Sequence, residues 1–557
     1  CLALLFLLSV PVLAQTADQT VGLFLNTDEA YPGYTLLAPL FGTSTYLIDN
    51  NGEKVHEWTH DRRPSGTTYL LETGQLLRGD LTINPALNFG GLGGRLQIVN
   101  WDGTQEWEFI FSDSLHALHH DTALLPSGNI LVLVWEYHST EDAIANGRDP
   151  AALPDSALWA ERIIEVKPTL PVGGEIVWSW SAWDHMVQDF DDSKLNFGVV
   201  GDHPERIDIN ASGVPPDADW IHSNAINYNA ELDQIVMSAP DFNELWVIDH
   251  GSTTEEAATA AGGRQDKGGD LLYRWGNPQV YDKGSASTLK LHFQHDTQWI
   301  PPGLPGAGNF MVFNNGLGRP EGAYSSVLEI PSPADASGAY PLTAEGAFVE
   351  PEPLWLYEKP DEFFGAFASG AQRLPNGNTL IDAAHTGRLF EVTTDGQIVW
   401  EYVSPVTADG PIARNDSIPV FFVPRGFLSN SVFRAYRYGL EYAAFLGRDL
   451  TPMGPIELEA TTAVEESDLP ASFVLGQNYP NPFNPVTSIP VTLNRAGRVN
   501  LQVFDLLGRS VATVADGYFE VGARTFSFDA TTLPSGLYVY RLTTADLTTS
   551  RAMTLLR

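Results

Sequence analysis

The stretch LFEVTTDGQIVWEY (389–402) joins an apolar strand to an apolar and aromatic strand across an Asp-Gly turn. An Asp-Gly pair between two β-rich runs is a strong signal for an antiparallel hairpin. The same arrangement recurs, with turns of varying length, at 45–60, 96–109, 163–180, 245–275 and 327–357. A hairpin repeated this often predicts a repeat fold rather than a single β-sandwich.

A second hairpin precedes each copy of the first. The clearest of these inner hairpins lie at 67–79, 121–137 and 371–384. Inner and outer hairpins alternate as four strands per unit, from about Gly33 to about Ser404. Six four-stranded units around a central channel form a six-bladed β-propeller. We therefore predict an all-β fold with a six-bladed β-propeller over residues 15–452.

The rest of the chain predicts a second, smaller domain. Residues 453–470 are acidic and contain Thr and Pro, which is typical of a linker. Residues 471–557 contain short β-rich runs separated by turn residues, and this pattern indicates a small Ig-like β-sandwich.

The first fourteen residues indicate export. Residues 1–14 form an apolar run that ends in a small residue before Gln15, which predicts a secretory signal peptide truncated at its start. This run is too short to span a membrane, and no other long apolar stretch follows, so we expect no membrane insertion. Cys1 is the one cysteine of the sequence, so the mature chain is expected to contain no disulfide and no cysteine-ligated metal.

The charge balance excludes one class of partner. The sequence has 69 acidic and 31 basic residues, a formal net charge of −38. A surface of this sign repels phosphate backbones and anionic membranes. We therefore expect no nucleic acid among the partners.

Three histidines stand at matching places in consecutive units. His120, His222 and His295 each precede an apolar or aromatic residue by four positions. Alternate residues of a strand share one face, so this repetition predicts three imidazoles at one end of the central channel. A histidine at a strand start can also serve only to bond neighbouring backbone, and the repetition is what favours a site. His119 flanks His120; either could face the channel, and the spacing favours His120.

The C-terminal domain carries a specific resemblance. LGQNYPNPFNP (475–485), VFDLLGR (503–509) and LPSGLYVYRL (533–542) closely resemble type IX secretion C-terminal sorting domains. The resemblance implies an Ig-like fold, recognition by the type IX secretion machinery and a cell-surface or extracellular location, as in Bacteroidota-type exported proteins.

The predicted propeller resembles the bacterial arylsulfotransferase family. The segments that carry the likeness, in the family's order, are HHD (119–121) with LPSGNIL, DWIHSNAINY (219–228), QHDTQW (294–299), NNGLGR (314–319), GAQRLPNGNTL (370–380) and FRAYRY (433–438). The resemblance implies transfer of a sulfuryl group from a phenolic sulfate ester to a phenolic acceptor through a sulfo-histidine, without a nucleotide sulfate donor or other cofactor. A structural Ca²⁺ cannot be read from the sequence.

The resemblance also assigns roles to individual residues. His295 matches the family's nucleophile, and His120 and His222 match its supporting donors. The residues expected to bind substrate are His119, Asn224, Arg319 and Asp296.

One position departs from the family pattern. The family places an arginine on the strand after the second histidine, where this chain reads MSAPDF with Pro240 at the matching place. A missing guanidinium removes a bidentate grip on sulfate oxygens. Arg319 is the candidate to compensate.

Two other functions stay open on the sequence alone. One is a non-catalytic surface propeller that binds glycans or phenolics. The other is a hydrolase or lyase whose metal is held by the histidines with Asp121 or Asp296, although no HExxH motif is present. Nucleotide-dependent chemistry is disfavoured, because the sequence contains no P-loop and no GxGxxG after a strand.

Overall fold

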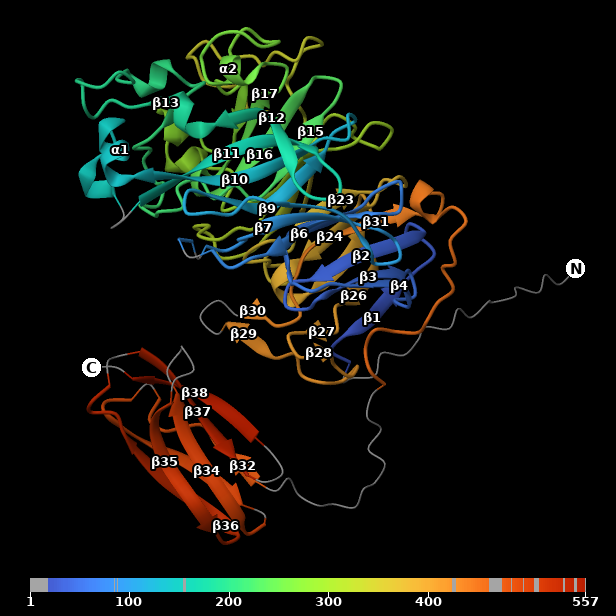
Figure 1. Ribbon diagram of the computed structural model, residues 1–557, viewed down its shortest axis with the longest axis vertical. Helices are drawn as coiled ribbons and strands as arrows, with labels where there is room; N and C mark the ends of the chain where they lie inside the picture. The colour runs from blue at the N-terminus through green and yellow to red at the C-terminus, as the bar shows by residue number, and fades with distance from the viewer. Residues whose placement is uncertain are drawn as a thin grey trace, which may run out of the picture. The chain divides into compact units, whose positions relative to one another are not determined.

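The computed structural model describes two compact units, Cys1–Ala460 and Thr461–Arg557, called unit 1 and unit 2 below. The described residues are 19–84, 86–87, 89–153, 157–422, 427–459, 473–481, 483–493, 495–504, 510–533, 536–544 and 548–555. The predicted signal peptide and residues 460–470 of the predicted linker lie outside them. The fold class is all-β, as the repeat predicts (Figure 1).

Unit 1 is built from four-stranded antiparallel sheets, numbered here in chain order. Sheet 1 contains β31 (Val432–Gly439), β2 (Gly33–Pro39), β3 (Ser44–Asp49) and β4 (Lys54–Thr59). Sheet 2 contains β5 (Pro64–Leu70), β6 (Leu76–Leu81), β7 (Gly94–Val99) and β8 (Gln105–Ile110). Sheet 3 contains β9 (His116–Leu124), β10 (Ile130–Ser139), β11 (Ala157–Pro168) and β12 (Gly174–Ser181), and a single parallel bridge joins β9 to β5.

The second half of unit 1 continues the series. Sheet 4 contains β15 (Ile226–Asn229), β16 (Gln234–Ala239), β17 (Glu244–Asp249) and β18 (Tyr273–Trp275). Sheet 5 contains β19 (His295–Trp299), β20 (Phe310–Asn314), β21 (Ser326–Ile330) and β22 (Trp355–Glu358). Sheet 6 contains β23 (Gly370–Arg373), β24 (Thr379–Ala383), β25 (Arg388–Val392) and β26 (Ile398–Val403), with β1 (Gly22–Asn26) added at its outer edge.

The two ends of unit 1 pair with distant strands. β31 pairs antiparallel with β2 as the innermost strand of sheet 1, with Leu36 opposite Tyr436. β1 pairs with β26, with Gly22 opposite Val403. Each pairing covers a strand edge that would otherwise be open. The ring of sheets is therefore closed by both ends of the unit.

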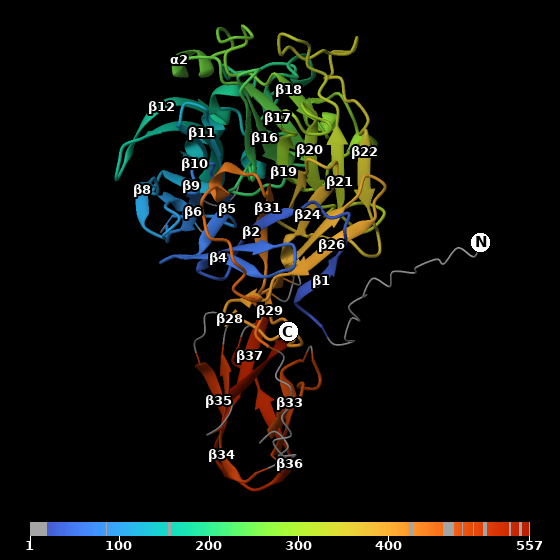
Figure 2. The same cartoon turned by 90° about the vertical axis from the view of Figure 1, so that its right-hand side faces the viewer.

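The aromatic residue of the repeated hairpin connects each sheet to the next. On the fourth strands of sheets 2 to 6, an indole Nε1–H donates to a backbone carbonyl in the following sheet: Trp107 to Gly173 (2.7 Å), Trp180 to Gly269 (2.7 Å), Trp275 to Pro351 (3.1 Å), Trp355 to Thr394 (2.9 Å) and Trp400 to Asn50 (2.8 Å). The last of these leads from sheet 6 back to sheet 1. Figure 2 shows the outer strands following one another around the unit, from β4 through β8, β12, β18 and β22 to β26. This is a propeller-like arrangement.

Short elements decorate the loops of unit 1. They are α1 (Thr140–Ala145), α2 (Thr254–Ala257) and the pairs β13 (Met186–Val187) with β14 (Ile207–Asp208), β27 (Val406–Thr407) with β28 (Gly410–Pro411), and β29 (Val420–Phe422) with β30 (Phe427–Leu428). Residues 453–459, predicted as linker, run along unit 1, because Met453 N donates to Lys54 O and Leu458 bridges to Ala413.

Unit 2 is a small sandwich of two antiparallel sheets. One contains β32 (Phe473–Leu475), β33 (Val486–Leu493) and β36 (Gly522–Asp529); the other contains β35 (Ser510–Phe519), β34 (Gly497–Phe504), β37 (Gly536–Thr543) and β38 (Thr548–Leu555). Alternate residues such as Ile489, Val491, Leu501 and Val503 are fully buried, as expected of strands with one face on a core. In neither unit does any described helix have the length and apolarity that a membrane crossing requires.

Candidate active site

Two of the three predicted histidines have an unusual backbone. His120 (φ 48°) and His222 (φ 55°) lie in the left-handed region, which non-glycine residues rarely adopt. Phe293 (φ 59°) and Asp296 (φ 52°) do the same on either side of His295. Strain of this kind survives only where surrounding structure imposes it, and it is concentrated at functional sites.

Two glycines make room for His120. A Cβ on Gly66 would lie 1.8 Å from the carbonyl oxygen of His120, and a Cβ on Gly91 would lie 2.0 Å from its Nε2. Gly91 also has a φ of +80°. A larger residue at position 66 would displace the backbone of His120, and one at position 91 would displace its imidazole.

His120, His222 and His295 line one cavity of about 700 Å³. The His120 and His222 rings are 4.9 Å apart between centroids and nearly perpendicular. Most of the remaining wall is apolar or aromatic, including Phe89, Phe293 and Phe433. Among the described residues that line the cavity there is no Arg or Lys, and its charged groups other than histidine are Asp217, Asp219 and Asp241.

His222 is the cation of this cavity. Its Nδ1 bonds Asp219 Oδ2, and the other oxygen of Asp219 accepts from Trp135 Nε1 at 2.8 Å. Burial disfavours the imidazolium, but the Asp219 carboxylate more than offsets burial and raises the pKa of His222 to about 9. His222 is therefore protonated at neutral pH and can donate a proton.

His295 is the opposite case. Its Nδ1–H donates to Asn315 Oδ1 at 2.8 Å, and its Nε2 accepts from the backbone N–H of Ala368 at 3.1 Å. Burial lowers the pKa of His295 to about 3 despite the bond to Asn315. The ring is therefore neutral with its lone pair on Nε2, which is the nucleophilic state of imidazole.

His120 is backed by a buried pair. His119 Nδ1 lies 2.9 Å from His120 Nδ1, and His119 Nε2 lies 2.7 Å from Glu161 Oε1. Burial lowers the pKa of His120 well below its usual range and lowers that of His119 to about 3. Burial and the nearby Asp219 raise the pKa of Glu161 well above its usual range, which favours its protonated form. Protonation of Glu161, in contact with His119 Nε2, would leave His119 Nδ1–H to donate to His120 and a proton on His120 Nε2.

A buried charged layer, formed by Arg434, Asp121 and Asp296, lies next to the histidines. Arg434 on β31 donates to Asp121 Oδ2 and to the Asn224 carbonyl, both at 2.7 Å, and its Nε lies 3.3 Å from Asp296 Oδ1. The two carboxylates raise the pKa of Arg434, although burial opposes them. One guanidinium thus connects the inner strands of sheets 1, 3 and 5.

The structure separates the seven residues predicted from sequence into two groups. His120, His222 and His295 line the cavity. His119, Asn224 and Asp296 are buried behind it, with the Nδ2 of Asn224 bonded to the Gln294 carbonyl. Arg319 does not line the cavity; it bonds Ser326 and lies over the Tyr324 ring.

Several residues of the site were not assigned from sequence. Asn315 and Arg434 fall inside NNGLGR and FRAYRY, two of the segments that resemble the family, and Asp219 stands three residues before His222 in DWIHSNAINY. Those segments were the available signal. Asp241 likewise falls inside MSAPDF, whereas Glu161 had no such signal.

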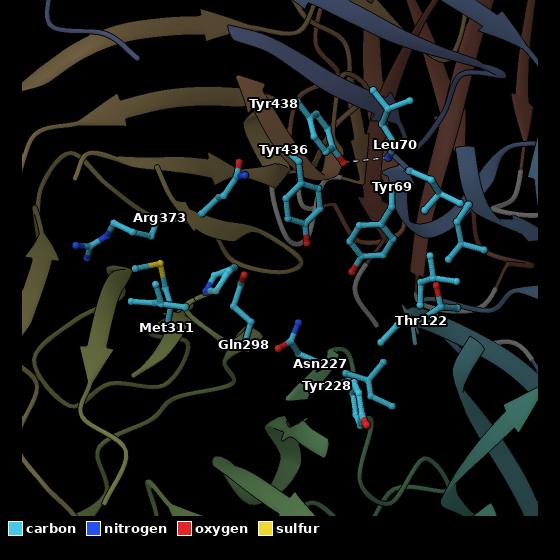
Figure 3. Close-up of a pocket in the computed structure, with 18 of the residues that line it drawn as sticks. Tyr69, Leu70, Thr122, Asn227, Tyr228, Gln298, Met311, Arg373, Tyr436 and Tyr438 are labelled. Carbon is cyan, nitrogen blue, oxygen red and sulfur yellow. Dashed lines mark hydrogen bonds between the residues drawn. The ribbon is translucent and has the colours of Figure 1, made fainter. Parts of the chain in front are cut away.

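Residues further along the same strands line a second cavity of about 320 Å³, called the tyrosine cavity below (Figure 3). Thr122, Asn227 and Gln298 follow His120, His222 and His295 by two to five positions and line it. Tyr69 and Tyr436 also line it (Figure 3), and the Tyr69 hydroxyl donates to Asp121 Oδ1 at 2.8 Å. Along each strand, the partners of Arg434 stand between the residues of the two cavities. Asp121 directly follows His120 and precedes Thr122, and Asp296 directly follows His295 and precedes Gln298.

No cluster of three metal-ligating side chains suited to a metal ion occurs among the described residues. The three histidines instead bond separate partners, Asp219, Asn315 and His119.

Two family models match the chain. One, described as Arylsulfotransferase (ASST), matches residues 34–408, more than half of the chain. The other, described as Secretion system C-terminal sorting domain, matches residues 477–555. Comparison with curated protein sequences finds no match.

Solved structures resemble the chain only distantly. A protein of unknown function from Bacteroides caccae has a TM-score of 0.36 at 13% identity, covering 73% of this chain and 98% of its own. A streptogramin B lyase has a TM-score of 0.33 at 11% identity, covering 76% of this chain and 96% of its own. A virginiamycin B lyase from Staphylococcus aureus has a TM-score of 0.31 at 10% identity, covering 71% of this chain and 87% of its own. At these scores the similarity supports no functional argument.

Proposed function

The chain belongs to the arylsulfotransferase family, and from this premise we propose that it moves a sulfuryl group from a phenolic sulfate ester to a phenolic acceptor through a sulfo-histidine at His295. Neither a nucleotide sulfate donor nor another cofactor enters the proposal. The observation that carries it is the convergence of three histidines on one cavity, with His222 paired to Asp219 and His295 Nδ1 bonded to Asn315 so that its Nε2 is the basic nitrogen.

In the first half-reaction, His295 Nε2 attacks the sulfur of the aryl sulfate. The N–S bond forms, the S–O bond to the aryl group breaks, and the electron pair leaves on the phenolate oxygen. The substrate takes the place of the Ala368 N–H as the partner of Nε2. The positive charge that develops on the His295 ring is stabilised by Asn315, which keeps the proton on Nδ1.

His222 supplies the proton that the leaving phenolate needs. A general acid of this kind contributes about 10²–10⁴-fold to the rate. His120 Nε2 donates to a sulfuryl oxygen, where charge grows in the transition state. In the second half-reaction an acceptor phenol gives its proton to the now neutral His222, its oxygen bonds to sulfur, and the N–S bond breaks.

The sorting domain indicates export to the cell surface or the extracellular space. The natural donor and acceptor are therefore proposed to be small phenolic compounds outside the cell, and the type IX machinery is the proposed partner in export.

The test is a single-turnover experiment. Purified protein is incubated with 4-nitrophenyl sulfate, and nitrophenol release and intact mass are followed, with and without phenol. We expect a burst of nitrophenol, a mass gain of one sulfuryl group, and loss of that gain when phenol is added. His295→Ala should abolish both signals, whereas His292→Ala, three residues away and not lining the cavity, should keep them. Release without a histidine-dependent adduct would reject the sulfo-histidine, and absence of release would reject the transferase.

A further inference from the structure

The cavity lined by His120, His222 and His295, called the histidine cavity below, contains one carboxyl group without a partner. Asp241 lies in the 3-10 turn Pro240–Phe242 between β16 and β17 and lines the cavity. It is only 9% exposed, and among the described residues its side chain makes no hydrogen bond or ion pair. Asp219 differs, because its two oxygens are engaged by His222 and Trp135.

The surroundings of Asp241 are acidic. Asp217 and Asp219 line the same cavity, and His222, already paired with Asp219, is the nearby cation. Burial and these two carboxylates raise the pKa of Asp241 to about 8, although His222 opposes them, so the carboxyl is largely protonated at neutral pH and ionises when a cation pairs with it. Burying a carboxyl without a partner is costly, so a cation that enters the cavity here is stabilised by pairing with it.

The rest of the wall is suited to an aromatic ring. Phe293 stacks near His222 with ring centroids 6.0 Å apart, and Phe433 lies 6.0 Å from the His120 ring. Phe89 adds a third phenyl group to the lining. The cavity therefore combines aromatic faces, the histidines and a carboxyl pair at Asp241 and Asp217.

We infer that this cavity selects phenolic substrates that carry an ammonium group, with the phenol oxygen at the histidines and the ammonium at Asp241 and Asp217. The inference rests on the proposed function and names its substrate class. Asp241 directly follows Pro240 in the turn that departs from the family pattern, and a carboxyl there pairs with an ammonium group but gains nothing from a carboxylate substituent.

The experiment compares three phenolic acceptors whose para substituents carry a positive charge, no charge or a negative charge. Tyramine, 4-ethylphenol and 3-(4-hydroxyphenyl)propionate are offered with 4-nitrophenyl sulfate as donor. We expect kcat/KM for tyramine to exceed that for 4-ethylphenol by about tenfold or more, the effect of one charge-assisted hydrogen bond. The propionate should be the poorest acceptor.

Variants locate the preference. In Asp241→Asn the tyramine preference should fall to within about twofold of equality, and Asp217→Asn should reduce it by a smaller factor because that residue is exposed. The ratio is measured within each variant, so a change in total activity cancels. Asp102→Asn, in the exposed β7–β8 turn, is the matched control and should leave the ratio unchanged. A wild-type ratio near one, or a preference that survives Asp241→Asn, would overturn the inference.

A binding measurement separates this inference from the proposed function. If no acceptor turns over, the transferase proposal fails, and calorimetric titration with tyramine and 4-ethylphenol still tests the cavity. Tighter binding of tyramine to the wild type, lost in Asp241→Asn, supports the inference. Equal affinity for the two phenols contradicts it.

Discussion

The two cavities of unit 1 are lined by the same inner strands but differ in backbone and charge. At the histidine cavity, His120 and His222 adopt left-handed conformations and an imidazolium–carboxylate pair is buried. At the tyrosine cavity, Thr122, Asn227 and Gln298 are not among the described non-glycine residues with positive φ, and the Tyr438 hydroxyl accepts from Leu70 N–H (Figure 3).

This difference shows at which end of the strands the strained backbone and the buried charge pair lie. Strain and paired charge cost stability and are retained at functional sites. At the tyrosine cavity, burial and Asp233 raise the pKa of Tyr228, so this phenol stays neutral and inert. One set of strands thus supplies a reactive end and an unreactive end, with the layer around Arg434 between them.

The largest expected effect comes from breaking that layer. Arg434→Met leaves Asp121 and Asp296 buried without their cation, and removing one partner of a buried pair costs about 3–5 kcal/mol. The free energy of unfolding, measured by chemical denaturation with tryptophan fluorescence, should fall by this amount. All 14 tryptophans precede residue 461, so the signal reports unit 1 alone. A change below about 1 kcal/mol would mean that the layer is not stabilising.

The next effect concerns the proton donor. His222 is protonated below its pKa of about 9, so the rate of the first half-reaction should be level at neutral pH and fall as pH rises through about 9. In Asp219→Asn burial is no longer offset, so this alkaline limb should move below about pH 6.5 and the rate at pH 8 should drop about 10²-fold. The pH profile of nitrophenol release measures both. An unmoved limb would assign the proton to another group.

A smaller effect distinguishes the two states of Glu161. Glu161→Met removes the support behind His119 and should lower kcat about tenfold, the usual cost of losing a group that orients a reactive side chain. Glu161→Gln keeps a neutral donor and should restore most of this activity, because the raised pKa of Glu161 favours its protonated form. The ¹⁵N shifts of His120 should show the altered tautomer only in the Met variant. Equal loss in both variants would mean that a charged carboxylate is required.

The smallest effect is expected at the other end of the channel. Tyr228→Phe removes the hydroxyl that donates to Asp233 and should lower the free energy of unfolding by about 1 kcal/mol or less. The rate of sulfuryl transfer should not change, since Tyr228 follows His222 by six residues and lines only the tyrosine cavity. A tenfold loss of activity would show that the two ends are coupled.

The sequence was sufficient to predict the sheets and part of the site. The aromatic strand of the repeated hairpin carries the tryptophans that connect successive sheets, and equal spacing identified the three histidines that line one cavity. Their partners could not be predicted this way. Asn315 is 20 residues from His295, and Arg434 is 313 residues from Asp121, so only the closed fold brings them together. The left-handed backbone at His120 could not be predicted from the sequence either, because it accompanies the close approach of Gly66 and Gly91, which only the folded chain brings to His120.

Closure by β31 has a consequence for biosynthesis. A chain is made from its N-terminus, so the strand that bears Arg434 is among the last parts of unit 1 to leave the ribosome. Until it docks, Asp121 and Asp296 lack their common counter-ion and β2 is an unpaired edge. A chain that ends before β31 therefore lacks both the counter-ion of the two carboxylates and the strand that covers β2.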